Sequence, residues 1–106
     1  MVANCALDEA GLRAQYERYR RAGKGARVRD RTPRRLVVDL DQHVDTKLVG
    51  ELLAIERECC PFFDLSWDRQ ARRLTVSVSR AEHEPALDAI SFALDLDGDP
   101  GHATPH

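Results

Sequence analysis

The chain has 106 residues, of which 42% are hydrophobic and 32% are charged. This size fits a single domain with one modest core, and the composition is ordinary for a soluble globular protein rather than a disordered one. No apolar run approaches the roughly 18 residues of a membrane-spanning helix, and the first residues show no secretory signal pattern. Three cysteines, two of them adjacent, make no disulfide framework, so we expect a cytoplasmic protein with reduced thiols and no membrane partner.

Positive charge is concentrated in residues 13–35, which carry ten basic and two acidic residues, a net charge of +8. Residues 36–106 carry six basic and fourteen acidic residues, a net charge of −8. The basic segment from Arg13 to Arg35 can recruit nucleic acid or an acidic partner. It can equally be a solvated face that pairs with the acidic remainder of the same chain. The sequence leaves both interpretations open.

The first half of the chain predicts a helix followed by two strands. Asp8 can cap this helix and Gly23 can end it. Residues 26–32 form a predicted edge strand, and strand alternation places its three arginines on one face: Arg27, Arg29 and Arg31. Residues 34–41 are the clearest strand, because buried-type and polar residues alternate along them.

The second half repeats this order. Residues 44–59 have the apolar spacing of a helix, and Pro61 should end it. Strands are predicted over residues 62–68 and 74–79, where the apolar period changes from 3.6 to 2. Pro85 suits the first turn of a last helix.

These elements predict an α+β fold in the order helix, hairpin, helix, hairpin, helix. Short connections favour antiparallel hairpins, so we expect a four-stranded antiparallel sheet with three helices on one face. Residues 1–96 would form a single domain, and residues 97–106, rich in glycine, proline and aspartate, a disordered tail.

The adjacent cysteines Cys59 and Cys60, followed by Pro61, are the best candidates for a functional site. Thiols at a helix C-terminus face the negative end of the helix dipole, which opposes thiolate formation unless a cation is bound. Zinc, copper(I) and mercury(II) prefer sulfur ligands, and arsenic(III) is similarly thiophilic. The helical wheel predicts that Cys59 is the more buried of the two.

Glu56 lies on the apolar side of the same predicted helix, one turn before both thiols. A buried carboxylate needs a partner. A metal ion, backbone amides or an arginine of the edge strand (Arg27, Arg29 or Arg31) would each serve. We therefore treat Glu56 as an auxiliary metal ligand or a hydrogen-bond acceptor beside the thiols.

Two adjacent residues hold one ion with difficulty, so a third ligand should come from elsewhere. Cys5, just before the first helix, is the candidate, and Glu56 or His43 would approach a tetrahedral zinc site. If the three thiols share an ion, the Cys5 sulfur must lie within about 3.5–5 Å of another cysteine sulfur.

The stretch Glu56-Arg57-Glu58-Cys59-Cys60-Pro61-Phe62-Phe63-Asp64-Leu65, with Cys5 upstream, resembles a set of short bacterial proteins that share a Glu-Arg-x-Cys-Cys-Pro-Phe motif. The likeness covers most of residues 5–96 and implies no assigned activity. The vicinal cysteines also resemble those of bacterial arsenic metallochaperones in ligand type, though not in fold.

We therefore expect a thiol protein that binds a soft metal or metalloid through Cys59, Cys60 and Cys5, for sensing, sequestration or delivery. One alternative is a thiol redox protein with a vicinal disulfide. Another is a non-catalytic interaction module that uses the basic segment. No residue pattern names an enzymatic reaction.

Overall fold

A computed structural model describes residues 8–96 of the chain. Its elements are, in chain order, α1 (Glu9–Ala22), β1 (Arg27–Thr32), β2 (Arg35–Asp39), α2 (Thr46–Cys59), β3 (Asp64–Asp68), β4 (Arg73–Ser77), the short 3-10 helix η1 (Ala81–His83) and α3 (Glu84–Ala93). The predicted order is confirmed, with η1 as an addition. The predicted tail, residues 97–106, lies outside the described residues.

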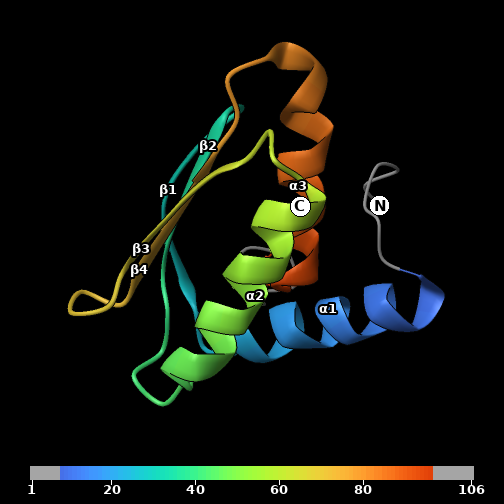
Figure 1. Cartoon of the computed structure of the whole chain (residues 1–106). Coiled ribbons are helices and arrows are strands. Elements are labelled where there is room, and N and C mark those ends of the chain that lie inside the picture. The colour runs from blue at the N-terminus through green and yellow to red at the C-terminus, as the bar shows by residue number, and fades with distance from the viewer. Residues whose placement is uncertain (1–7, 97–106) are drawn as a thin grey trace, which may run out of the picture.

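The four strands form one antiparallel sheet in the order β1-β2-β4-β3. Each hairpin contributes one central strand, and the two central strands pair with each other. The three helices lie on one side of the sheet and leave the other side uncovered (Figure 1). The predicted α+β class is therefore confirmed.

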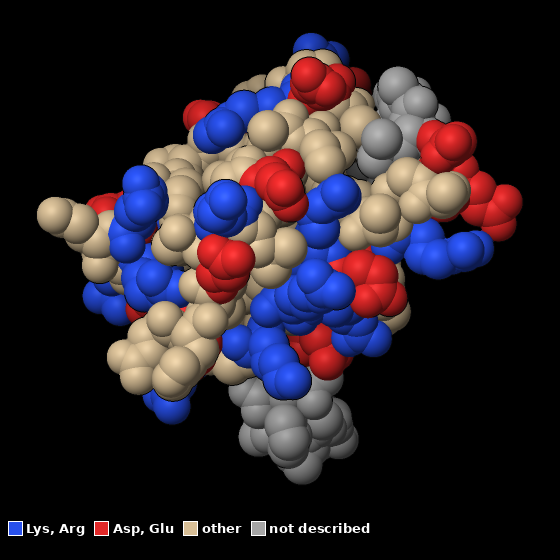
Figure 2. Space-filling model, turned by 60° about the horizontal axis from the view of Figure 1, so that its bottom comes forward, with Lys and Arg blue, Asp and Glu red and all other residues tan. Residues whose placement is uncertain are grey.

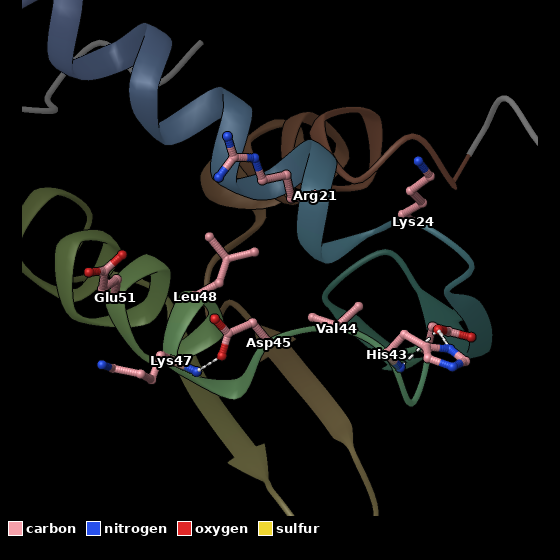
Figure 3. A pocket seen from close by; sticks show the side chains of 9 residues that line it. Arg21, Lys24, His43, Val44, Asp45, Lys47, Leu48 and Glu51 are labelled. Atoms are coloured by element: carbon pink, nitrogen blue, oxygen red, sulfur yellow. Dashed lines mark hydrogen bonds and ion pairs between the residues drawn. The ribbon is translucent and has the colours of Figure 1, made fainter.

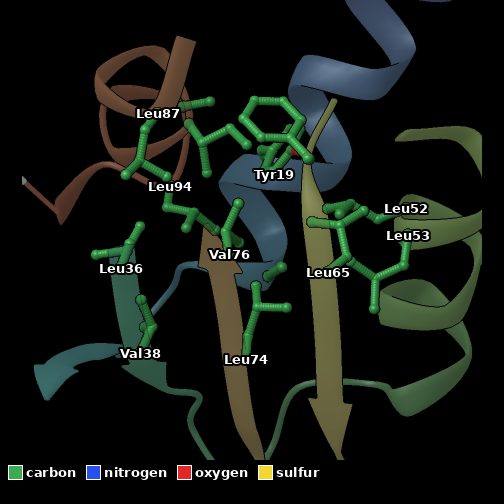
Figure 4. Packing of buried hydrophobic residues seen from close by; sticks show 14 of the residues in the cluster. Tyr19, Leu36, Val38, Leu52, Leu53, Leu65, Leu74, Val76, Leu87 and Leu94 are labelled. Atoms are coloured by element: carbon green, nitrogen blue, oxygen red, sulfur yellow. The ribbon is translucent and has the colours of Figure 1, made fainter. Parts of the chain in front are cut away.

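The helix-covered face of the sheet carries the core. The register aligns two apolar rows across β2, β4 and β3, namely Leu36 with Val76 and Leu65, and Val38 with Leu74 and Trp67. Leucines of α2 and α3 and Tyr19 of α1 pack over these rows (Figure 4). Each fully buried aliphatic side chain contributes about 1.5–3 kcal/mol to folding. This packing fixes the positions of α1 and α2, and with them the candidate site.

The open face of the sheet is polar, and charges alternate along one row across all four strands: Arg27, Asp39, Arg73 and Asp68. The Asp39 carboxylate accepts hydrogen bonds from Arg73 Nε at 2.9 Å and from Arg29 Nη1 at 3.0 Å. The hydrogen bond from Arg73 is the largest of the effects that lower the pKa of Asp39. Two arginines of the open face thus satisfy the Asp39 carboxylate.

A β-bulge in β1 corrects one expectation about the basic segment. The bulge shifts the register, so that Arg31 aligns with buried Leu36 and forms an ion pair with Asp88 of α3. Residues aligned across an antiparallel pair share a face, so Arg31 lies on the helix-covered side. Arg27 and Arg29 stay on the open side. The expectation that all three arginines share one face is wrong, because an extra residue in a strand reverses the alternation.

The end of α1 approaches α3 so closely that only glycine fits there. A Cβ atom on Gly23 would lie 2.1 Å from the carbonyl oxygen of Leu94. Gly23 was expected to end this helix, and it is the C-cap residue. Within residues 8–96, no helix is both long enough and apolar enough to cross a bilayer.

Candidate thiol site at the end of the second helix

Backbone hydrogen bonds before and after the cysteine pair hold the end of α2. Cys60 is the C-cap, with φ −132° and ψ 72°, and its backbone N–H donates to the carbonyl of Glu56 at 2.8 Å. The next turn closes through a hydrogen bond from Phe63 N to Cys60 O at 3.1 Å. Pro61 cannot continue a helix and restrains the residue before it to extended conformations. The predicted helix end is confirmed, and both thiols sit on an ordered chain reversal.

Both cysteines are buried, with Cys59 6% exposed and Cys60 0% exposed. The helical wheel predicts the opposite order, and this prediction is wrong. A wheel assumes helical dihedral angles, whereas Cys60 has left the helix and turns its side chain into the core beside Phe63. Burial and the negative helix end both disfavour an unassisted thiolate. Both thiols are therefore shielded from solvent.

Glu56 is 4% exposed, as its place on the apolar side predicts. Its Oε1 accepts a hydrogen bond from Nε2 of Gln15 in α1 at 3.1 Å, and the same nitrogen donates to Leu52 O at 3.0 Å. Gln15 is itself 3% exposed and accepts from Arg18 Nη1 at 3.0 Å. The partner of Glu56 is thus a neutral amide of another helix, a candidate that the sequence analysis did not include.

Gln15 could have been found from sequence by its spacing. It lies three residues after Leu12 and four before Tyr19, on the apolar side of α1. A glutamine at such a position is a polar group that needs a buried partner. A polar residue on the apolar side of each of two helices indicates that the two side chains pair with each other when the helices pack.

Cys5 lies outside the described residues, so its distance from the other thiols stays a prediction. Within residues 8–96, no group of three or more His, Cys, Asp or Glu side chains is placed to hold a metal ion. The described chain thus supplies two of the three expected thiols and leaves the third position to be tested.

His43 does not belong to this site, and its proposed role as a further ligand is wrong. It precedes α2, whose length at about 1.5 Å per residue separates it from Cys59 by about 20 Å. The His43 side chain is 82% exposed, and its Nδ1 lies 3.0 Å from Asp41 Oδ2. The backbone N–H of His43 also donates a hydrogen bond to the Asp41 carboxylate. This hydrogen bond is the largest of the effects that lower the pKa of Asp41.

The start of α2 borders an open cleft of about 540 Å³ beside the end of α1 (Figure 3). Side chains of both signs line it, among them Arg21, Lys24, Asp45 and Lys47. Asp45 caps the helix by accepting from Lys47 N at 2.9 Å. Because the cleft is wide and lined by both positive and negative side chains, it indicates no particular class of ligand.

His83, the last residue of η1, lies close to the chain reversal that carries the thiols. Its ring stacks on Phe62, two residues after Cys60, with centroids 4.2 Å apart and an interplanar angle of 17°. Its Nδ1 is buried and has no hydrogen-bond partner among residues 8–96. The stack thus involves a residue of the chain reversal that follows the thiols.

The basic segment is largely neutralised by the protein itself. Seven of its ten basic residues form ion pairs with described acidic residues: Arg13, Arg18, Arg20, Arg29, Arg31, Arg34 and Arg35. Lys and Arg gather on one face of the molecule with Asp and Glu between them (Figure 2). This arrangement favours the interpretation in which the segment pairs with the rest of the chain.

Fold and site together define a small α+β protein with a buried vicinal thiol pair. Comparison with known protein families, with curated proteins and with solved structures finds no match.

Proposed function

We propose that this protein binds one soft metal or metalloid ion through the thiolates of Cys59 and Cys60, with Cys5 as the third sulfur ligand. Zinc, copper(I), mercury(II) and arsenic(III) are the candidate ions, since each prefers sulfur. The role would be sensing, sequestration or delivery in a reducing cytoplasm. In this proposal Glu56 is the hydrogen-bond acceptor near the site rather than a ligand, because Gln15 already holds its carboxylate.

The observation that carries the proposal is the burial of two adjacent thiols on one fixed chain reversal. A bound cation offsets both the desolvation of a thiolate and the negative helix end, which no neutral ligand does. The chain reversal also limits the freedom that the thiols lose when they bind an ion. The cost of ordering the ligands is correspondingly small.

The two alternatives have less support. Redox cysteines are accessible and have a low pKa, whereas Cys59 and Cys60 are nearly sealed from solvent at the unfavourable end of a helix dipole. An interaction module needs unpaired basic residues, and most of the basic segment pairs internally. Metal binding is the function that these positions suit best.

Native mass spectrometry of the reduced protein, with one equivalent of Zn(II), Cu(I), Hg(II) or As(III) in turn, tests the proposal. We expect one ion per chain in the wild type and a much lower occupancy in Cys59→Ala and Cys60→Ala, each of which loses one sulfur ligand. Val49→Ala is the matched control, because it removes buried atoms from the same helix without touching sulfur. Wild-type occupancy in both cysteine variants would refute the proposal. A loss of two hydrogens on mild oxidation would favour the redox alternative.

A further inference from the structure

A second cavity lies between α1 and α3, is lined in part by Glu56 of α2, and has a volume of about 240 Å³. Its walls are apolar and include Leu12, Tyr16, Ala89 and Phe92. Tyr16 is 36% exposed and Phe92 is 62% exposed, so the cavity reaches the surface between two aromatic rings. The volume is below the roughly 300–1,000 Å³ of drug-sized pockets, which fits a molecule of fragment size.

Two tyrosines, Tyr16 and Tyr19, line this cavity together with Glu56 and Gln15, and the last two are each more than nine-tenths buried. Gln15 uses its amide nitrogen on Leu52 and Glu56, and its oxygen accepts from Arg18. Glu56 has accepted one hydrogen bond, whereas a carboxylate offers about four acceptor positions. The Glu56 carboxylate therefore keeps acceptor positions for a further donor.

The negative charge of the Glu56 carboxylate determines which kind of ligand would bind in the cavity. Among residues 8–96, no basic side chain forms an ion pair with Glu56, and Arg18 reaches only Gln15 and Glu51. A buried carboxylate without a cation is costly, and a ligand that brings an ammonium group would relieve that cost. A carboxylate ligand would be repelled, and a neutral ligand would gain only the apolar walls.

We propose that this cavity binds a small primary amine with an aromatic or aliphatic body. The ammonium group donates to Glu56, and the body lies between Tyr16 and Phe92. The cavity shares Glu56 with the surroundings of the proposed metal site. It needs neither thiol.

Ligand-observed NMR with three probes of equal size tests the proposal: 2-phenylethylamine, 2-phenylethanol and phenylacetate. We expect the amine to bind about tenfold more tightly than the alcohol, as one charge-assisted hydrogen bond predicts, and phenylacetate not to bind. Glu56→Gln keeps the shape of the side chain and should bring the amine to the affinity of the alcohol. Equal binding of amine and carboxylate, or no binding of the amine, would refute the proposal.

A second variant keeps the test decisive if Glu56→Gln fails to fold. Ala89→Phe fills the cavity from α3 and should abolish binding of both the amine and the alcohol. Ala71→Phe, in an exposed turn away from the cavity, is its matched control and should leave both affinities unchanged. Cys59→Ala should also leave amine binding unchanged, which separates this site from the metal site. Amine binding that survives Ala89→Phe would contradict the proposed location.

Discussion

The two ends of α2 satisfy their polar groups in opposite ways. At the exposed start, Asp45 caps its own helix, and Asp41 is paired with a residue two positions away. At the buried end, Glu56 depends on Gln15 of another helix. Polar groups in water can be satisfied locally, whereas buried ones need a partner that only the tertiary fold brings. Substitutions should therefore have small, local effects at the start and large effects across elements at the end.

The largest effect is expected for Gln15→Leu, which removes the amide that holds the buried Glu56 carboxylate. We expect a loss of about 3 kcal/mol in the free energy of unfolding, because the remaining carboxylate stays desolvated without its donor. Urea denaturation followed by circular dichroism measures it. The double variant Gln15→Leu with Glu56→Leu should be more stable than the sum of the single effects indicates. Strict additivity would show that the two side chains do not interact.

Cys60→Ser should come next, at about 2 kcal/mol, because it places a hydroxyl group in a position with no solvent exposure. Ala71→Ser, in an exposed turn, is the control and should change stability by less than about 0.5 kcal/mol. The same urea experiment compares them. A Cys60→Ser protein as stable as the wild type would contradict this account of the buried end.

Asp45→Ala probes the exposed end and should cost about 1 kcal/mol, the usual value for loss of an N-cap side chain. The cost arises because the backbone N–H of Lys47 loses its side-chain acceptor. Asp45→Asn should restore most of the stability, since asparagine is also a good cap. A cost above that of Cys60→Ser would reverse the proposed contrast between the two ends.

The smallest effect should be a change in acid sensitivity at Asp41, whose pKa is lowered in the folded protein from 3.8, mainly by the backbone N–H of His43. A carboxyl with a lowered folded pKa stabilises the protein above its unfolded pKa, and this stabilisation is lost as pH falls through the folded pKa. Asp41→Asn should therefore flatten the fall in urea midpoint below about pH 4. His43→Ala keeps the backbone donor and should retain most of that fall. Identical pH profiles for Asp41→Asn and the wild type would contradict this account.

The sequence predicts those features that depend on local pattern. The apolar periods give the order of elements, and Pro61 gives the end of α2, because a proline acts on its immediate neighbours. The burial of Glu56 also follows from its position on the helix. These predictions need no knowledge of how the elements pack.

The remaining features depend on departures from regular geometry or on tertiary contacts. The face of Arg31 changes because β1 contains a bulge, and the burial of Cys60 exceeds that of Cys59 because the helix has already ended. The pairing of Glu56 with Gln15 requires the packing of α1 against α2. A periodic pattern carries no information on any of these.

X-ray absorption at the zinc K-edge of the zinc-loaded, reduced protein tests the central claim most directly. The account predicts two or three sulfur neighbours at about 2.3 Å in the wild type, and one fewer in Cys59→Ala wherever zinc is retained. Val49→Ala should give the wild-type spectrum. A first shell of nitrogen and oxygen alone at about 2.0–2.2 Å would contradict the claim that the buried thiols at the end of α2 bind the ion.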